Sequence, residues 1–288
     1  MIPGTTRHTA EINGIKMFWM EAGEGAPVYL LHGWPETSFA WRKQIPALAG
    51  KYKLVIPDLR GYGETAKPAG GYDKRTMAAD IRALMRHLGH ERIALVGHDR
   101  GARVSTRFAK DYRDAIDRLV VMDNIPTRVV FQSMNAKIAK GYWFFTFNQV
   151  PDLPEALIQG REEIWLRHFY STWSYDPQMM THEEVAEYVR AYAQPGGLRG
   201  GFNDYRAGAE DLAQDMEDAA ELINCPILTL WGRDFDLVGG MFDVLEVWKG
   251  MGTNVQGMAI PQCGHLPQEE QPGIVNAELL RFLDGWAG

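Results

Sequence analysis

The stretch Val96-Gly97-His98-Asp99-Arg100-Gly101-Ala102-Arg103 decides the fold. The residues before it, 92–96, predict a buried strand, and the residues from 103 to 110 predict a helix. Gly97 and Gly101 stand two residues to either side of Asp99, which is the spacing of a strand–turn–helix nucleophile elbow. Only glycine lets a strand and a helix approach each other across so tight a bend, and the strained turn presents its central side chain to a pocket.

The central side chain of this turn, Asp99, is a carboxylate, and that choice selects the chemistry. A serine that displaced a leaving group from saturated carbon would leave an ether, which water does not cleave at useful rates. A carboxylate leaves an alkyl ester, which an activated water can hydrolyse. Asp99 therefore predicts attack on saturated carbon, as in opening an epoxide or expelling a halide. The plainer alternative is that Asp99 only caps the helix.

Composition narrows the class of protein. A chain of 288 residues with 45% hydrophobic content suits one large α/β domain with an inserted cap. Its net charge of -7 argues against nucleic acid or an anionic membrane surface as a partner. Cys225 and Cys263 lie far apart, without metal-ligand spacing, and the first residues lack the apolar region of a signal peptide. We therefore expect a cytoplasmic protein with two structural thiols.

Short apolar runs alternate with helical periodicity in the first part of the chain. Asn13-Gly14 predicts a hairpin, strands are predicted over 28–31, 53–57 and 119–122, and a helix is predicted from Thr76 until Gly89 stops it. This alternation indicates a mostly parallel, doubly wound sheet, the α/β class. Functional groups gather at the carboxyl ends of such strands. The polar residues at these ends are His32, Asp58, Asp99 and Asp123.

The middle of the chain differs from the rest in composition and in hydrophobic pattern. Residues 127–220 contain no strand signal and are rich in aromatic residues, so they predict a helical cap inserted into a core formed by 1–126 and 221–288. The glycine-rich stretch 194–201 is expected to break this cap into two lobes and to flex. The core then resumes with strands predicted over 227–231 and 255–260 and a final helix over 273–286.

A nucleophile of this kind needs a base and an acid. On this kind of sheet the histidine comes last in the chain, and His265 is the only histidine after the last predicted strand. As general base it would take a proton from the water that attacks the ester on Asp99. The acid that orients it is either Asp123, which we favour, or one of Asp234 and Asp236, which follow a later strand.

The loop His32-Gly33-Trp34 is expected to complete the site. The backbone N–H groups of Trp34 and Arg100 would face the charge that develops during ester hydrolysis. His32 is predicted to be structural, and His98 is predicted to pack beside its strand.

These motifs identify a resemblance to the α/β-hydrolase superfamily, in its epoxide hydrolase and dehalogenase branch. The nearest match is to fluoroacetate (haloacetate) dehalogenases. The motifs that carry it are Leu31-His32-Gly33-Trp34-Pro35, Pro57-Asp58-Leu59-Arg60-Gly61-Tyr62-Gly63, the stretch 95–103, Asp123-Asn124-Ile125-Pro126-Thr127, Asp204-Tyr205-Arg206-Ala207 and Gly264-His265. Epoxide hydrolases and haloalkane dehalogenases usually carry tryptophan straight after the nucleophile, whereas this chain carries Arg100.

The resemblance implies roles for several further residues. Arg100 and Arg103 would clamp a substrate carboxylate by bidentate hydrogen bonds, since Asp99 and Arg103 share a helix face. The plainer alternative is that Arg103 and Arg107 form salt bridges on the outer face of the helix. Tyr205 would donate its hydroxyl to the departing halide.

The segment 141–147 departs from the dehalogenase pattern, because it lacks the histidine that helps to hold fluoride there. Depending on the register, either Phe144 and Phe145 replace the family's His-Trp pair or Trp143 retains one donor. The leaving-group pocket is therefore assigned to Tyr205, Trp143, Phe144 and Phe145.

The sequence leads to one main hypothesis and two alternatives. The main one is a hydrolytic dehalogenase of short 2-haloacids, needing no metal or organic cofactor, with a homodimer as a further expectation. An epoxide hydrolase is the first alternative; it would protonate the opening oxygen with one or two cap tyrosines, drawn from Tyr142, Tyr170, Tyr175 and Tyr205. A ligand receptor without catalysis is the second.

Overall fold

The computed structural model describes residues 2–286 and 288, and an eight-stranded sheet in the order β1-β2-β4-β3-β5-β6-β7-β8 runs through its centre. The first two neighbouring pairs are antiparallel, and all later pairs are parallel. The predicted mostly parallel α/β sheet is confirmed. The strands are β1 (Thr6–Ile12), β2 (Ile15–Ala22), β3 (Ala26–Leu31), β4 (Tyr52–Pro57), β5 (Ile93–His98), β6 (Ile116–Met122), β7 (Ile227–Gly232) and β8 (Val255–Ile260).

The predicted hairpin joins β1 to β2. Asn13 and Gly14 have φ of 50° and 75°, the positive values that a two-residue turn of this kind requires. Ile12 then pairs with Ile15, and the register continues to Thr6 and Glu21.

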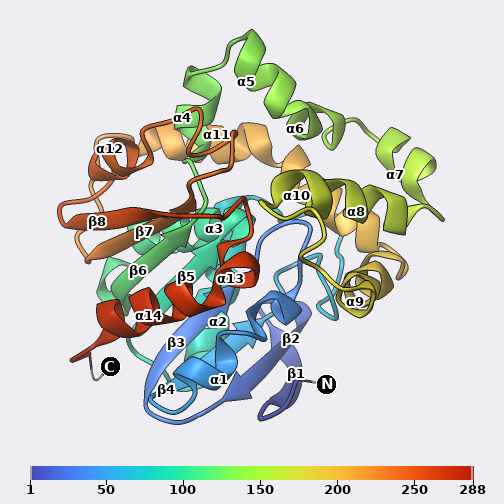
Figure 1. Ribbon diagram of the computed structural model, residues 1–288. Helices are drawn as coiled ribbons and strands as arrows, with labels where there is room; N and C mark the ends of the chain where they lie inside the picture. The colour runs from blue at the N-terminus through green and yellow to red at the C-terminus, as the bar shows by residue number, and fades with distance from the viewer. Residues whose placement is uncertain (1, 287) are drawn as a thin grey trace.

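Helices cover both faces of the sheet (Figure 1). The side chains of β3 show how the two faces form, because Tyr29 and Leu31 lie in the core beneath α2 and α3, while Val28 and Leu30 lie in the core beneath α1 and α14. Both cores are buried, so the sheet is a rigid platform for the loops at its carboxyl edge. The core helices are η1 (Ser38–Trp41), α1 (Ile45–Leu48), α2 (Lys74–His87), α3 (Asp99–Asp111), η2 (Arg113–Ala115), α12 (Val244–Lys249), α13 (Pro267–Glu270) and α14 (Pro272–Leu283).

Local signals explain where these helices begin. Asp73 caps α2 by accepting a hydrogen bond from the backbone N–H of Thr76 at 3.0 Å, and Gly89, with φ of 74°, follows its end. Helix α3 begins at Asp99 itself, four residues before the predicted start. The nucleophile candidate therefore lies in the first turn of a helix.

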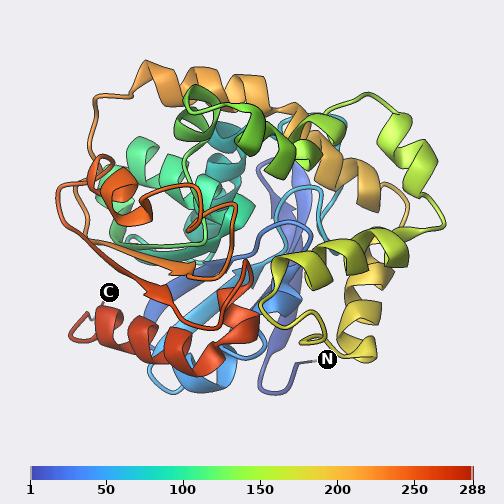
Figure 2. The ribbon, with the colours of Figure 1, turned by 45° about the horizontal axis from the view of Figure 1, so that its top comes forward.

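A helical insert lies between β6 and β7, at the top and right of Figure 1 and across the top and down the right side in the turned view of Figure 2. It occupies the stretch for which the sequence predicts a cap; the exact division at 126 and 221 stays a prediction. A capping box between Thr181 and Glu184 starts α9. The helices of the insert are α4 (Thr127–Gln132), α5 (Ala136–Gly141), α6 (Trp143–Phe147), α7 (Leu153–Ile158), α8 (Glu162–Trp173), α9 (His182–Tyr192), α10 (Gly197–Arg206) and α11 (Gly208–Glu217).

The glycine-rich stretch 194–201 begins as a break, because residues 193–196 form the turn between α9 and α10; the division into lobes and the flexing stay predictions. Residues from Gly197 onward form the first turns of α10. A Cβ on Gly200 would lie 2.0 Å from the carbonyl oxygen of Gly61, so this glycine lets α10 pack directly on the loop after β4. Gly200 is thus needed for close packing.

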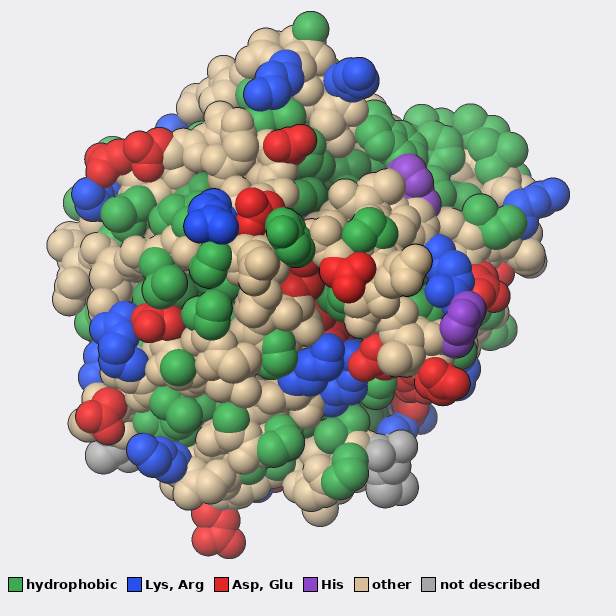
Figure 3. All heavy atoms as spheres, in the orientation of Figure 1, with side chains coloured by type: hydrophobic (Ala, Val, Ile, Leu, Met, Phe, Trp, Pro, Cys, Tyr) green, Lys and Arg blue, Asp and Glu red, His purple; other side chains and the backbone are tan. Residues whose placement is uncertain are grey.

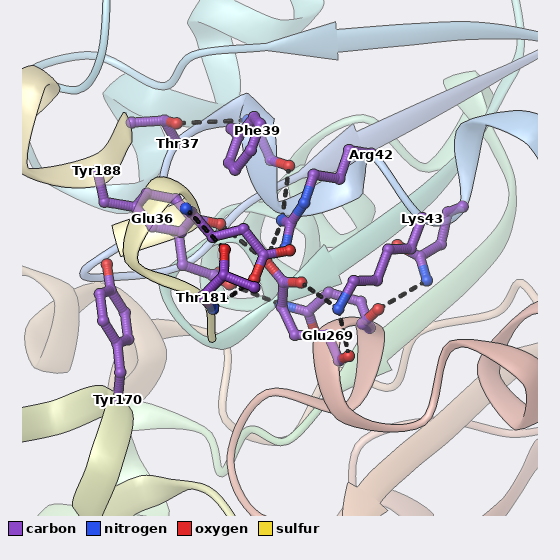
Figure 4. Close-up of polar contacts among 12 residues, drawn as sticks. Glu36, Thr37, Phe39, Arg42, Lys43, Tyr170, Thr181, Tyr188 and Glu269 are labelled. Atoms are coloured by element: carbon purple, nitrogen blue, oxygen red, sulfur yellow. Dashed lines mark hydrogen bonds and ion pairs between the residues drawn. The ribbon is translucent and has the colours of Figure 1, made fainter. Parts of the chain in front are cut away.

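Charged and aromatic contacts hold the insert on the core (Figure 4). Arg42, just after η1, bonds Glu184 of α9 at 2.5 Å and also pairs with the buried Glu269 of α13. Glu269 further accepts a hydrogen bond from the hydroxyl of Tyr188 at 3.0 Å and lies 3.2 Å from the amine of Lys43. One arginine thus joins a cap helix to the segment that follows His265.

The outer surface carries apolar side chains at one end of the insert. Figure 3 shows hydrophobic side chains gathered at the upper right, where Figure 1 places α7. Leu153, Leu157 and Ile164, all from α7 and α8, are 48%, 52% and 71% exposed. The homodimer expected from the sequence stays a prediction. Among the described helices, none combines the length and apolar character needed to cross a membrane.

Candidate active site

The elbow has the strained geometry that its glycines predict. Asp99 has a φ of 46°, in the left-handed region that few residues other than glycine adopt. A Cβ on Gly97 would lie 2.6 Å from the carbonyl oxygen of Gly101, and a Cβ on Gly101 would lie 2.3 Å from that of Leu31. The two glycines are therefore required by β5, α3 and β3 meeting at this turn.

One of the two oxygens of the Asp99 carboxylate is held by a hydrogen bond. Its Oδ1 accepts a hydrogen bond from the backbone N–H of Trp34 at 2.9 Å, and the side-chain amide of Asn124 donates to its backbone oxygen at 3.0 Å. The Trp34 N–H therefore lies where the sequence predicts an oxyanion donor. No hydrogen bond from the backbone N–H of Arg100 to this carboxylate is found among the described residues, so its oxyanion role stays a prediction.

His265 lies beside the other oxygen of the same carboxylate. Its Nε2 is 3.7 Å from Asp99 Oδ2, and its Nδ1 is 2.5 Å from Oδ2 of Asp123. Asp123 Oδ1 accepts from the backbone N–H of Gly232 at 2.9 Å. Burial raises the pKa of Asp123, while the bond and charge of His265 oppose that rise. Because Nδ1 is engaged, Nε2 is left to face Asp99, the arrangement of a base with an orienting acid.

The alternative acids lie away from the imidazole. Asp234 and Asp236 are exposed, and Oδ2 of Asp234 accepts a long hydrogen bond of 3.4 Å from the backbone N–H of Cys263 and lies 3.8 Å from Nε of Arg233. Phe235, between them, instead packs its ring against His265 at 4.9 Å. The structure thus brings Asp123, and not the alternatives, to His265.

A cavity opens beside these groups, between the core and α5–α6. Its cavity volume is small, ≈ 20 Å³, about the room of one water molecule. Buried and unpaired among the described residues, the Nε2 of His265 is free to bond a water or a substrate here. Eight of its thirteen lining residues are apolar or aromatic, and its charged groups lie together at Asp99, Arg103, Asp123 and His265, so it suits a small molecule with a polar reacting end. Its lining consists of Asp99, Arg103, Asp123, Asn124, Ile125, Tyr142, Phe144, Phe145, Trp173, Phe235, Leu237, Val238 and His265.

Arg100, predicted to clamp a substrate carboxylate, is already engaged. Its Nε donates to Asp204 Oδ1 at 3.0 Å, and its Nη2 donates to the same oxygen and to the Asp204 backbone oxygen at 2.8 Å. It is 3% exposed and is not part of the cavity lining. The structure therefore does not place Arg100 as a carboxylate clamp, because an acid 104 residues away in the chain takes its donors.

Arg103 is different, because it does line the cavity together with Asp99. Its Nη1 bonds the hydroxyl of Thr127, and its Nε is buried without a partner among the described residues. Burial, followed by the charge of Arg100, lowers the pKa of Arg103. Both Arg103 and Arg107 are buried, at 6% and 4% exposed, so the outer-face position is wrong, although Arg107 does form salt bridges with Asp111 and Asp218.

The predicted leaving-group pocket is only partly assembled. Phe144 and Phe145 line the cavity, whereas Trp143 is 39% exposed and does not. Its indole packs instead on Phe169, with ring centroids 6.1 Å apart. Trp143 points outward because successive residues of a helix face different directions. Its placement in the pocket is therefore not supported.

Tyr205 lies one layer behind the cavity wall. Its ring packs against Phe145 and Trp34, with centroids 5.3 Å apart in each case. Burial, followed by the charge of Asp99, raises the pKa of Tyr205. Its role toward a leaving group stays a prediction.

The other cap tyrosines differ in how close they lie to the cavity. Tyr142 lines the cavity and donates its hydroxyl to the backbone oxygen of Leu237 at 2.8 Å. The Tyr170 hydroxyl is occupied by the backbone oxygen of Pro35 at 2.5 Å, and Tyr175 is 52% exposed. Tyr142 and Tyr205 are thus the tyrosines of this set that lie at the cavity or against its wall.

A buried polar group behind His265 was missed from the sequence. His98 bonds Glu36 at 2.8 Å through Nδ1 and the backbone oxygen of His265 at 2.6 Å through Nε2. Glu36 also accepts from the backbone N–H of Gly33 at 3.1 Å and from Gln268 at 2.7 Å. Burial lowers the pKa of His98, but the charge and hydrogen bond of Glu36 outweigh it and raise the pKa to about 9. The only local signal was Glu36 directly after the loop motif. By contrast, His32 is structural as predicted: it is fully buried, and its Nε2 accepts from the backbone N–H of Leu59 at 3.1 Å.

Within the described part of the chain, no group of three His, Cys, Asp or Glu side chains is placed to hold a metal ion. What the arrangement offers is a nucleophilic carboxylate, an oriented imidazole and a backbone N–H donor around one small cavity.

Comparison with known proteins defines the class. A family profile described as "alpha/beta hydrolase fold" matches residues 26–272. The chain therefore belongs to the α/β-hydrolase family, and its relatives place it in the epoxide hydrolase and dehalogenase branch.

The similar proteins have two kinds of names. A soluble epoxide hydrolase of Corynebacterium sp. (strain C12) is 38% identical over 284 residues, covering 96% of this chain and 97% of the relative. A fluoroacetate dehalogenase of Burkholderia sp. is 33% identical over 296 residues, covering 98% and 95%. The solved structure of the epoxide hydrolase CorEH without ligand has a TM-score of 0.91 and 37% identity, covering 97% of this chain and 98% of that one.

Proposed function

We propose that this protein is an epoxide hydrolase that opens small epoxides through an alkyl ester on Asp99. This choice reverses the order of the two hypotheses drawn from the sequence. The observation that carries it is the engagement of Arg100 by Asp204, because the residue that argued for a carboxylate substrate is already paired. The greater identity to a relative named as an epoxide hydrolase supports it too.

The first step forms the ester. Asp99 Oδ1 is bonded to the N–H of Trp34, so Oδ2, which faces His265, attacks one epoxide carbon. The C–O bond of the epoxide breaks, and its electron pair goes to the oxygen. A proton from Tyr142 or Tyr205 neutralises this oxygen, since a phenol near the reacting atoms is a suitable general acid.

The second step hydrolyses the ester. A water beside Nε2 of His265 loses one proton to the imidazole and attacks the ester carbonyl carbon. The carbonyl oxygen is Oδ1, already at 2.9 Å from the Trp34 N–H that stabilises its developing charge. Collapse releases the diol oxygen, which takes the proton from His265, and the second proton of the water returns to the tyrosine. The sum is epoxide plus water to diol.

A single-turnover experiment in ¹⁸O-labelled water, with enzyme in excess over styrene oxide, tests the covalent route. We expect the first diol formed to carry ¹⁶O, because its new oxygen comes from Asp99 Oδ2. The label should appear in the Asp99 peptide instead. A diol labelled in the first turnover would mean direct attack by water. No diol from any small epoxide, while haloacetates release halide, would overturn the proposed substrate class.

A second candidate, dehalogenation of short 2-haloacids, is favoured by Arg103. This guanidinium is buried, lines the cavity with Asp99, and has an unpaired Nε. It could hold a carboxylate beside the nucleophile. Halide release from chloroacetate that is lost in Arg103→Leu, while styrene oxide is still hydrolysed, would support this activity.

A further inference from the structure

A buried cluster of opposite charges lies behind Tyr205. It consists of Lys74, Arg100, Asp204 and Asp211, which we call the ion cluster. All four side chains are 4% exposed or less. Two cations and two anions balance, and the hydroxyl of Tyr62 donates a further hydrogen bond to Asp204 Oδ2 at 2.6 Å. Asp204 is thus bonded by three neighbours, whereas Oδ2 of Asp211 has only the ion-pair contact with Lys74 at 3.2 Å and a longer one with Arg100 at 3.6 Å.

The ion cluster fixes the plane of one guanidinium. Asp204 accepts from both Nε and Nη2 of Arg100, and Lys74 bonds the same Asp204 oxygen from the other side at 2.5 Å. Arg100 follows Asp99 at the start of α3, whereas Asp204 precedes Tyr205 on α10. The pair therefore ties the nucleophile's helix to the helix of the tyrosine.

The fixed guanidinium lies against the face of Tyr205. Its central carbon is 4.6 Å from the ring centroid, within the range at which a cation is attracted to an aromatic face. On its other sides the ring contacts Trp34 and Phe145. A phenol that gives up its proton becomes negatively charged, and a cation held at its face stabilises that charge without reorganising.

We propose that Arg100 is a positioning residue, which the Asp204 carboxylate holds against Tyr205 so that Tyr205 can protonate the opening epoxide oxygen. The inference rests on the proposed function. In the balanced reaction the phenolate forms with the ester and is reprotonated when water cleaves it. Arg100 consequently acts on the ester-forming step, in which the phenolate appears, whereas the attack of water that limits ester hydrolysis depends on His265.

The test is the rate of ester formation in a single turnover of styrene oxide, followed by quenching and mass spectrometry of the Asp99 peptide. Arg100→Met should slow this step on the order of tenfold, the scale of a desolvated cation–π contact. Ester hydrolysis should keep its rate. Arg100→Lys should recover part of the loss, because it keeps the cation but not the fork. Arg107→Met removes a buried arginine from the same helix that bonds Asp218 at 2.5 Å, and should leave the step unchanged.

A double-mutant cycle separates this role from general support of the fold. In a Tyr205→Phe background, Arg100→Met should cause no further loss of the ester-forming rate. An equal loss in both backgrounds, or no loss in either, would overturn the proposal. Arg100→Met leaves Asp204 buried with less charge compensation, so Arg100→Met with Asp204→Asn serves as a second variant if the first does not fold.

The proposed function and the inference fail differently. Wild-type protein that forms no ester with epoxides would overturn both. If the wild type turns over haloacetate, and Arg100→Met raises its KM without changing ester formation, Arg100 binds a substrate carboxylate and the positioning role is wrong. If the wild type hydrolyses epoxides but Arg100→Met causes the same loss with and without Tyr205→Phe, the proposed function stands and only the positioning role is wrong.

Discussion

His98 donates a hydrogen bond to the backbone oxygen of His265 at 2.6 Å, so the residue before the nucleophile holds the loop of the base. Its other nitrogen bonds Glu36, and the pKa of His98 is raised to about 9. An unfolded histidine has a pKa of about 6.5. The charged form thus stabilises the fold fully below pH of about 6.5, and this contribution disappears as the pH rises through about 9.

We therefore expect the wild type to lose roughly 3 kcal/mol of unfolding free energy between pH 6 and 9.5 through this one group. Urea unfolding at the two pH values measures it. In His98→Gln the same pH change should lower the unfolding free energy markedly less. The other titrating groups are the same in both proteins, so the difference reports on His98. Identical pH profiles for the two proteins would show that His98 is not charged in the fold.

Replacing the base should trap the intermediate. In His265→Gln, Asp99 should still be alkylated by styrene oxide, but the ester should persist because no group takes the proton of the attacking water. Intact-protein mass spectrometry should show one added substrate mass, located on the Asp99 peptide. His168→Gln changes an exposed histidine of the cap and should show no adduct at steady state. A chain that stays unmodified in His265→Gln would argue against covalent catalysis.

The orienting acid can be tested against its sequence alternative. Asp123→Asn should lower kcat by roughly 10³- to 10⁴-fold, because an amide facing Nδ1 favours the wrong tautomer of His265. Asp234→Asn, which alters an exposed carboxyl, should retain nearly full activity. Steady-state diol formation by both variants decides the assignment. A larger loss of activity in Asp234→Asn than in Asp123→Asn would assign the orienting acid to the loop after β7 instead.

The elbow glycines should be intolerant of a methyl group. Gly101→Ala would place a Cβ 2.3 Å from the backbone oxygen of Leu31, forcing β3 and α3 apart. We expect a loss of about 3 kcal/mol or more in unfolding free energy, together with most activity. Gly273→Ala lies in the first turn of α14 with nothing within 4 Å of the added atom, and should be neutral or slightly stabilising. Chemical denaturation compares the two.

Arg42 is expected to matter for stability more than an exposed arginine. Its side chain is 12% exposed, and Arg42→Met would remove the main counterion of the fully buried Glu269 (Figure 4). A cost of about 3 kcal/mol is expected. Arg281→Met breaks an ion pair with Glu278 at a side chain that is 54% exposed, and should cost less than about 1 kcal/mol. Equal effects in urea unfolding would mean that water reaches the Arg42 pair.

The sequence predicts well what depends on neighbours in the chain. Residues 97–101 predict the elbow and Asn13-Gly14 predicts the hairpin, because both turns need backbone angles that few residues adopt. The histidine of the site could be found too, since the order of the elements restricts it to the last loop. These features are local, or follow from topology.

Contacts between distant segments could not be predicted. The pairing of Arg100 with Asp204 on α10 is one such contact, because nothing in the sequence near either residue shows that they meet. The need for glycine at position 200 is another, because it arises from Gly61, which passes beside it. Trp143 was placed inward by a motif whose register the sequence left open. In each case side-chain packing in three dimensions decided the outcome.

Asp123 directly follows β6, shortly before the helical insert begins at Thr127, and its bond to the backbone N–H of Gly232 reaches the strand at which the chain returns. The backbone N–H of Asp123 also bonds the oxygen of Leu230 at 2.7 Å. The roughly hundred residues between them leave and re-enter through one pair of adjacent strands. The insert is thus a separate unit of the chain, and the orienting acid itself ties its two ends together. Exchanging it for another cap would change which molecules fit, while the chemistry stays in place beneath.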